Sequence, residues 1–258
     1  MITSLNNPQV KRVKRLHSQK GRRQAQRFIV EGLRLVEEAL RADNIPALMF
    51  YSPRLENLAR GRTLLASARN KLVRPTLVSE KVMRAMATTT IPQSVLAVLP
   101  TLALSWPEHP TLLLILDRLR DPGNLGSALR TAEAAGIDGV LLSPGTVDAY
   151  NPKVVRGGMG AHFWLAPRAA PWPEIEQATQ GLRVWLAEAR GGVPYYKVDW
   201  SVPSALITGG EAGGGSAEAQ GLAGDRVSIP MPGQAESLNA AVAAGVILFE
   251  AARQRSLA

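Results

Sequence analysis

Short apolar runs alternate with helix-like periodicity along the whole chain. In the first part, Val10, Val13 and Leu16 recur at every third position and predict a short amphipathic helix. Strands and helices alternate after it, and Ser79 can serve as the N-cap of one helix. We expect strands at 28–30, 47–51, 77–78 and 95–99, and helices at 32–41, 55–68 and 80–87. This alternation predicts a small α/β domain.

The chain from residue 112 onward has a cleaner α/β pattern. The aliphatic run 112–116 is typical of a strand buried on both faces, and 127–135 predicts a helix that ends at Gly136. Asn151-Pro152 begins another helix, with proline in its first turn. Further strands are expected at 140–142, 163–165, 183–186, 206–208 and 227–229, and a last helix at 237–255.

Two prolines among polar residues near 105–110 indicate a boundary between these parts. We therefore divide the chain into a domain at 1–103, a linker at 104–111 and a larger domain at 112–258.

Charge is distributed unevenly between the two parts. The whole chain carries a net charge of +9. Residues 1–105 hold 18 basic and 6 acidic side chains, which gives +12, and the remainder holds 12 and 15, which gives −3. The first part therefore predicts a polyanionic partner, and nucleic acid is the commonest one; a solvated basic surface is the alternative. The residues expected to bind such a partner are Lys11, Arg12, Arg15, Arg22, Arg23 and Arg27.

Composition excludes several kinds of chemistry. The chain has no cysteine, so disulfides, thiolate metal sites and cysteine nucleophiles are excluded. Its three histidines are scattered without ligand spacing, and no metal is expected. We find neither an apolar stretch of about 18 residues nor a secretory signal, which predicts a cytoplasmic protein without a membrane span.

A first candidate site follows the strand at 112–116. Residues 117–126 connect that strand to a helix, and loops in this position line the ligand crevice of open α/β sheets. Pro122-Gly123 is expected to turn the chain and to place Asn124 at the loop tip, with Arg130 within reach of the same space. Taken alone, the segment also fits an ordinary turn with a capping asparagine.

Two more segments have the composition of a site. Residues 206–215 end a strand in glycines that would let a ligand approach the backbone, and Glu211 lies among them. Residues 229–239 turn from a strand into a helix rich in small residues, which would allow close packing against another backbone. Taken singly, the first also fits a flexible loop, and the second fits a turn in which Ser237 is only an N-cap.

Together, the three segments resemble the motifs of the SpoU/TrmH family, in the SPOUT class of methyltransferases. The family has a loop with Asp, Pro, Asn and Gly before an Arg in the next helix, then a Gly-x-Glu-x-x-Gly turn and an Ile-Pro-Met to Ser-Leu-Asn turn. The resemblance covers 112–258, with Ala212 standing where the family has Gly. Residues 4–11, 28–32 and 89–98 resemble the RNA-binding extension of members that act on ribosomal RNA.

The resemblance implies a fold and an activity. The expected fold is α/β, with a C-terminal SPOUT domain that has a parallel sheet and a deep trefoil knot, plus a smaller N-terminal α/β RNA-binding domain. A homodimer would bind S-adenosylmethionine in the knot and methylate a ribose 2′-hydroxyl of RNA, with large-subunit ribosomal RNA as the expected substrate. The implied cofactor-binding residues are Thr208, Gly209, Gly210, Ile229, Met231, Ser237 and Leu238, and the implied catalytic residues are Asn124, Arg130, Glu211, Ser237 and Asn239.

The chemistry suggests a role for each catalytic residue. A ribose hydroxyl must lose its proton at or before the transition state. Because arginine is almost never deprotonated in proteins, we expect Arg130 to stabilise the developing alkoxide or hold the adjacent phosphate. Asn124 and Asn239 would orient these groups, supported by Ser237 and Glu211. Methylation of transfer RNA, methylation of a base, and RNA binding without catalysis are the alternatives, and the sequence does not name the nucleotide.

Overall fold

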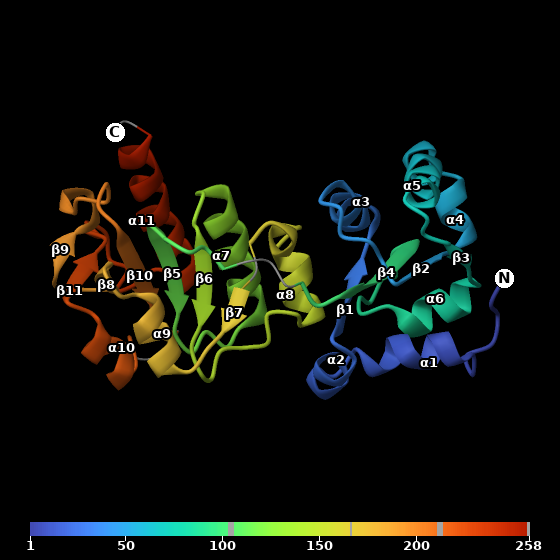
Figure 1. The fold of residues 1–258 in the computed structure, drawn as a ribbon, viewed down its shortest axis with the longest axis horizontal. Coiled ribbons are helices and arrows are strands. Elements are labelled where there is room, and N and C mark those ends of the chain that lie inside the picture. Colours follow the sequence, from blue (N-terminus) through green and yellow to red (C-terminus); the bar gives the residue numbers. More distant parts are fainter. Residues whose placement is uncertain (103–105, 166, 211–213, 257–258) are drawn as a thin grey trace. The chain divides into compact units, whose positions relative to one another are not determined.

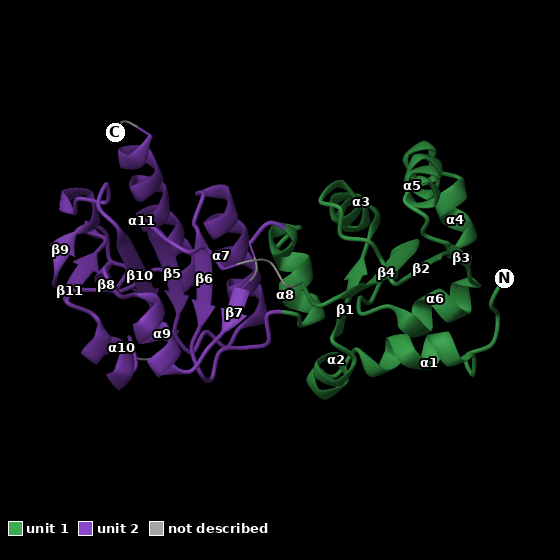
Figure 2. Cartoon of the chain, viewed as in Figure 1, with its two compact units in different colours: residues 1–102, 150–163 green, residues 103–149, 164–258 purple. Residues whose placement is uncertain are grey.

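The computed structural model describes residues 1–102, 106–165, 167–210 and 214–256. Its chain forms two compact units (Figures 1 and 2). The first unit contains residues 1–102 and 150–163, and the second contains 103–149 and 164–258. The segment 150–163 follows the first strands of the second unit in sequence but packs within the first unit. None of the helices in the described ranges has the length and apolar character needed to cross a membrane.

A four-stranded sheet forms the centre of the first unit. Its strands are β1 (Arg27–Glu31), β2 (Leu48–Tyr51), β3 (Thr76–Leu77) and β4 (Val95–Pro100), in the order β1-β4-β2-β3. Strand β4 runs antiparallel to β1 and β2, and β2 runs parallel to β3. The helices are α1 (Pro8–Arg15), α2 (Gln19–Ala25), α3 (Leu33–Arg41), α4 (Pro53–Glu56), α5 (Ala59–Asn70), α6 (Glu80–Met86) and α8 (Pro152–Gly157).

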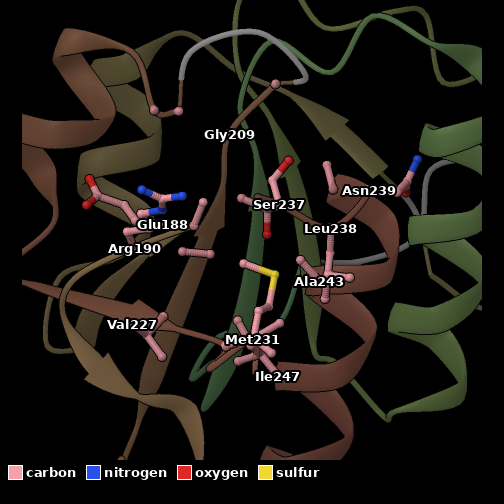
Figure 3. Close-up of a pocket in the computed structure, with 18 of the residues that line it drawn as sticks. Glu188, Arg190, Gly209, Val227, Met231, Ser237, Leu238, Asn239, Ala243 and Ile247 are labelled. Carbon is pink, nitrogen blue, oxygen red and sulfur yellow. The ribbon is translucent and has the colours of Figure 1, made fainter. Parts of the chain in front are cut away.

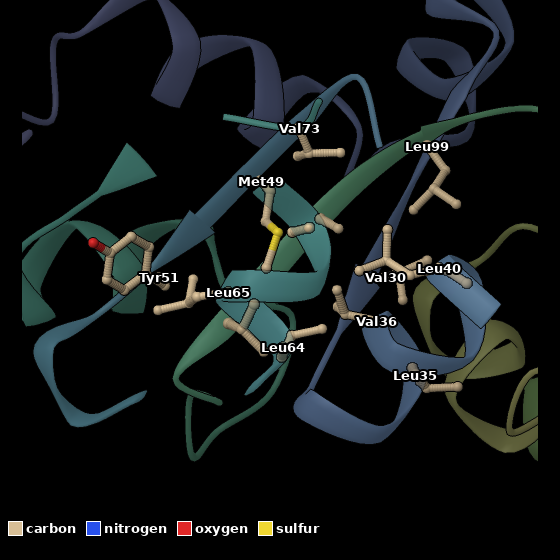
Figure 4. Packing of buried hydrophobic residues seen from close by; sticks show 14 of the residues in the cluster. Val30, Leu35, Val36, Leu40, Met49, Tyr51, Leu64, Leu65, Val73 and Leu99 are labelled. Carbon is tan, nitrogen blue, oxygen red and sulfur yellow. The ribbon is translucent and has the colours of Figure 1, made fainter. Parts of the chain in front are cut away.

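Alternate residues of this sheet enter two separate cores, as the two-residue period of a strand requires. Phe28, Val30 and Met49 pack with α3 and α5 on one face (Figure 4). The intervening Ile29 and Val98 pack with α1 and α6 on the other face. The segment 150–163 joins the first of these cores, where the rings of Tyr150 and Phe28 lie 4.8 Å apart.

Most predicted elements of this unit are confirmed, including the helix with Val10 and Val13 buried and the Ser79 cap, whose hydroxyl accepts from the Val82 amide. The helix expected at 55–68 is instead two helices, α4 and α5. Gly61 allows their junction to be tight, because a Cβ there would lie 2.1 Å from the carbonyl oxygen of Leu55.

The second unit is built on a seven-stranded sheet in which every neighbouring pair is parallel. The strand order is β7-β6-β5-β10-β8-β11-β9, so β6 and β7 lie on one side of β5 and all later strands lie on the other side, with β10 inserted between β5 and β8. Ligands bind at such a switch point, beyond the carboxyl ends of the strands. The strands are β5 (Leu112–Leu116), β6 (Gly139–Leu142), β7 (Pro167–Ala169), β8 (Arg183–Glu188), β9 (Val193–Pro194), β10 (Ser204–Thr208) and β11 (Asp225–Ser228).

Helices pack against this sheet. Helices α9 (Trp172–Ala178) and α10 (Ala217–Leu222) share a core with alternate residues of β5, β8 and β10. Helix α11 (Ala240–Arg255) packs against α7 (Pro122–Ala134) and contacts β10. A Cβ on Gly245 of α11 would lie 3.1 Å from the Thr131 side chain of α7. The small residues of α11 therefore allow the close packing that the sequence predicted.

Three predictions for residues 112–258 were wrong in detail. Helix α7 begins at Pro122 rather than at residue 127, so Asn124 lies in its first helical turn and not at a loop tip. No strand forms at 163–165; a 3-10 helix covers Ala161–Phe163, and the next strand is β7. Helix α11 begins at Ala240, and its N-cap is Asn239 rather than Ser237.

Candidate functional site

A pocket of about 620 Å³ lies at the carboxyl ends of β8 and β10, beside the start of α11 (Figure 3). This volume is within the range of roughly 300–1,000 Å³ that ligand sites occupy. The described lining combines the second and third candidate segments. All seven residues predicted to bind a cofactor line it: Thr208, Gly209, Gly210, Ile229, Met231, Ser237 and Leu238.

Backbone packing determines the shape of this pocket where β10 ends. A Cβ on Gly209 would lie 2.5 Å from the backbone of Gly214, and one on Gly210 would lie 2.7 Å from the carbonyl oxygen of Arg118. Both distances are too short for any side chain. Gly210 also pairs with Gly214 in an isolated bridge. The glycines are therefore required by close backbone contacts, and they leave backbone exposed to the pocket.

Polar groups occur at a few points of the lining. Thr208 is 4% exposed, and its hydroxyl has no hydrogen-bond partner among the described residues. An unpartnered buried hydroxyl is costly unless a ligand completes its hydrogen bonding. Glu188 and Arg190 add charges of opposite sign, and Glu188 also accepts a 3.1 Å hydrogen bond from Arg226. This lining suits a ligand with an apolar body and charged ends.

The first and third candidate segments meet at two asparagines. The Asn239 amide nitrogen donates to the Asn124 amide oxygen at 2.8 Å. The Asn239 side-chain oxygen also accepts from the amides of Ala241 and Val242, which caps α11. Asn124 in turn follows Asp121, the N-cap of α7, whose carboxylate accepts from the Asn124 amide. One hydrogen bond therefore links the first turns of α7 and α11.

The remaining predicted catalytic residues are placed differently from one another. Ser237 is exposed and lines the pocket beside Leu238. Arg130 is exposed on α7 and does not line the pocket. Glu211 lies outside the described residues, as does Ala212.

A buried carboxylate joins the strand ends behind the first segment. Asp117 follows β5 and is fully buried. It accepts a 2.7 Å hydrogen bond from the Ser143 hydroxyl and another of 2.7 Å from the Ser216 amide. Asp117 thereby connects the chain after β5 with the chain after β6 and with the N-cap of α10.

Five of the six predicted RNA-binding residues, Lys11, Arg12, Arg15, Arg23 and Arg27, are exposed on the first unit. Arg22 is the exception, at 5% exposure. Its guanidinium donates to the carbonyl oxygens of Leu16 and His17 at 2.8 and 3.0 Å. Those carbonyls lie at and just beyond the end of α1, so Arg22 stabilises the turn between α1 and α2.

Comparison with known proteins identifies the family. Residues 111–249, more than half of the chain, match the SpoU rRNA Methylase family. The chain belongs to that family. Residues 7–97 also match the MRM3-like substrate binding domain. The SpoU family assignment confirms the resemblance drawn from the three motifs.

Relatives with known activities span almost the whole chain. The 23S rRNA (guanosine(2553)-2'-O)-methyltransferase RlmP of Bacillus subtilis is 35% identical, over 96% of this chain and 97% of its own. The 23S rRNA (uridine(2479)-2'-O)-methyltransferase of Streptomyces viridochromogenes is 32% identical, over 91% of this chain and 85% of its own. The AdoMet-bound rRNA methyltransferase from Sinorhizobium meliloti superposes with a TM-score of 0.84 at 34% identity, covering 98% of this chain and 97% of that one.

Several pocket residues of this SpoU member were missed by the motif comparison. Glu188 and Arg190 are at the end of β8, and Gln220 lies on α10. The strand at 183–186 was predicted, and the carboxyl ends of parallel strands meet at one edge of a sheet. That rule would have indicated Glu188 and Arg190, whereas no sequence pattern indicated Gln220, whose helix was not predicted.

Proposed function

We propose that this protein transfers the methyl group of S-adenosylmethionine to a ribose 2′-hydroxyl of large-subunit ribosomal RNA. The observation that carries the proposal is the convergence of two motifs on one pocket in a chain of the SpoU family. Relatives aligned over almost the whole chain methylate 23S ribosomal RNA at ribose. Because those relatives modify different nucleosides, the proposal extends to the RNA class and not to one nucleotide.

The pocket's own residues fit the cofactor. Its apolar side chains, Met231, Leu238 and Ile247 among them, suit a flat adenosine, and the backbone at Gly209 can supply hydrogen bonds. Thr208 offers a hydroxyl that has no partner among the residues that the structure describes. Glu188 and Arg190 have charges complementary to an ammonium and a carboxylate. When bound, the cofactor supplies the reactive methyl carbon, while alignment and electrostatics come from the protein.

The protein's own residues would act on the ribose. Arg130 would stabilise the alkoxide that develops on the hydroxyl or hold the neighbouring phosphate, since its guanidinium keeps its charge. The Asn239 to Asn124 hydrogen bond supports a positioning role for both amides. Ser237 and Glu211 would support these groups, as the family resemblance implies. Holding the ribose in line with the methyl group accounts for much of the rate in such reactions.

The two parts of the chain would have different roles in the reaction. Residues 1–103 would hold the RNA substrate and 112–258 would carry catalysis, with 104–111 as linker. The excess positive charge of the first part and its match to a substrate-binding domain support this division. Of the predicted contacts we retain Lys11, Arg12, Arg15, Arg23 and Arg27, because the Arg22 guanidinium is used within the fold.

We also propose a homodimer. Val242 and Phe249 of α11 are 52% and 51% exposed, and Val246 lies between them on the same stripe. Apolar stripes of this kind commonly form interfaces. Val242 is one residue from Ala243, which lines the pocket, so an interface here would lie near the active site.

We expect a cytoplasmic location, and a deep trefoil knot around the pocket as the family resemblance implies.

The test is methyl incorporation from tritiated S-adenosylmethionine into large-subunit RNA from a host strain that lacks the gene. We expect label at one ribose, detected as an alkali-resistant linkage. Leu238→Arg, which puts a bulky charge into the pocket, should abolish both incorporation and cofactor binding measured by calorimetry. Label on a base, or on transfer RNA alone, would contradict the substrate assignment. Cofactor binding without incorporation into any RNA would contradict the activity.

A further inference from the structure

The first unit contains a second cavity, of about 260 Å³, between α1, α2 and the sheet. Its floor is apolar and includes Val13, Leu16 and Val98, which belong to the core beneath α1 and α6. Its rim carries three guanidinium groups, from Arg12, Arg15 and Arg27. We propose that this cavity binds one unpaired nucleotide of the RNA substrate, an inference that rests on the proposed RNA-binding role of the first unit.

The charges of the cavity favour a nucleotide over an apolar ligand. None of its lining residues, all of them described, is acidic. Arg12, Arg15 and Arg27 are exposed and form no ion pair with the described residues. Guanidinium groups bind phosphate in a two-pronged geometry and also stack on bases. Phosphate at the rim and a base on the apolar floor would therefore satisfy both parts of the cavity.

The wall between α1 and α2 is fixed before any ligand binds. Arg22 ties the two helices together through the carbonyls of Leu16 and His17. A Cβ on Gly21 would lie 1.9 Å from the carbonyl oxygen of Arg15, so α2 crosses the end of α1 in direct contact. The Ser18 hydroxyl accepts from the Gly21 amide and donates to the carbonyl of Arg15. A rigid wall lowers the entropic cost of binding.

The cavity would distinguish unpaired from paired RNA rather than one base from another. A base within a duplex cannot enter a side cavity without leaving its stack, whereas loops, bulges and ends present bases that can. Gln24 is the one uncharged polar side chain among the lining residues. One amide can read little of a base edge, so we expect all four bases to be accepted.

The test fills the cavity without changing its charge. Ala25 is exposed at the end of α2 and lines the cavity, so Ala25→Leu adds side-chain volume at the cavity. Ala66 is an exposed alanine on α5 outside the cavity, so Ala66→Leu is the matched control. The probes are a mixed-sequence single-stranded RNA of about 12 nucleotides and its duplex, which span the site sizes of single-strand binders. Binding is followed by fluorescence anisotropy over a salt series with the full-length protein.

We expect Ala25→Leu to weaken single-strand binding about 5- to 100-fold, the range expected for loss of one stacked base. Duplex binding and the salt slope should not change, and Ala66→Leu should behave as the wild type. Equal affinities of the two leucine variants would overturn the cavity proposal, as would an equal loss for single strand and duplex.

A second pair of variants separates the cavity from general electrostatics. Arg15→Gln removes a rim charge, and Arg23→Gln removes an exposed charge from α2 outside the cavity. Both should lower the salt slope by about one, but Arg15→Gln should cost more single-strand affinity. Equal losses would overturn the cavity. Unchanged affinity and slope in both variants, or a wild-type protein that binds neither probe, would instead overturn RNA binding by the first unit.

Discussion

The pocket at the end of β10 is walled largely by backbone and small residues, whereas the cavity between α1 and α2 is rimmed by long cationic side chains. Glycines with no space for a Cβ shape the pocket, as at Gly209 and Gly210. The cavity instead depends on three exposed arginines over an apolar floor. Binding in the pocket should therefore depend on backbone geometry and little on salt, while binding at the cavity should depend on charge and strongly on salt.

The largest expected effect is a loss of methyl transfer without a loss of cofactor binding. Arg130→Ala should reduce methyl transfer about 100- to 1000-fold, the usual cost of losing one electrostatic group that acts on the transition state. Cofactor affinity by calorimetry should stay near the wild-type value, because Arg130 does not line the pocket. Arg130→Lys retains a charge but loses the planar fork, so it should restore little of the rate. Full activity in Arg130→Ala would refute its catalytic role.

The dependence of the pocket on close backbone contacts is tested at Gly209. Gly209→Ala places a Cβ 2.5 Å from the backbone of Gly214, so the turn must shift. Overpacking of this kind typically costs about 1–3 kcal/mol of stability. Because the shifted turn lines the pocket, we expect part of this cost to fall on the bound state and to lower cofactor affinity by about 10-fold. Gly221→Ala is the control, because a Cβ there meets nothing within 4 Å. If calorimetry shows equal affinities for the two variants, the backbone contact does not shape the site.

Two adjacent arginines on α2, Arg22 and Arg23, test which side chains near the cavity stabilise the fold and which bind RNA. Arg22→Ala removes a buried guanidinium that donates to Leu16 and His17, and it should cost about 2 kcal/mol of unfolding free energy in urea denaturation. Arg23→Ala removes an exposed charge from the same helix and should leave stability within about 0.5 kcal/mol. Its effect should appear as weaker RNA binding. Similar stability of both variants would show that the observed Arg22 contacts contribute little.

The sequence predicted those helices and strands in which apolar residues repeat with the period of the element. The run 112–116 is strand β5, and Val10 and Val13 are buried on α1, because burial on one face or both leaves a readable repeat. The sequence pattern did not show that Arg22 is buried while Arg23 is exposed. Whether a basic side chain faces solvent or a carbonyl depends on the crossing of α2 over α1, which no local pattern encodes.

Two motifs predicted residues that line the pocket, and the errors concern where helices begin. Pro122 and Gly123 suggested a turn, but proline at the first position of a helix costs no hydrogen bond, and the Asp121 cap begins α7 there. Ser237 and Asn239 are both good caps by residue type. Only the path of the chain selects Asn239, whose oxygen reaches the amides of Ala241 and Val242. Glu188 could have been predicted from the strand at 183–186 and the shared carboxyl edge of a parallel sheet, whereas Gln220 could not, because no sequence pattern indicated its helix.

The smallest expected effect concerns Asn239. Its side-chain oxygen caps α11, and its side-chain nitrogen donates to Asn124. Asn239→Ala removes the cap of α11 and should cost about 1 kcal/mol in urea denaturation. Asn239→Asp keeps an oxygen that can cap, and its charge is favourable at a helix N-terminus, so its stability should stay near the wild-type value. Both variants lose the donor to Asn124. Methyl transfer should therefore fall in both variants, although only Ala is destabilised. A fully active Asn239→Asp would show that the contact with Asn124 is not needed, and equal destabilisation of the two variants would show that capping is not the stabilising role of this side chain.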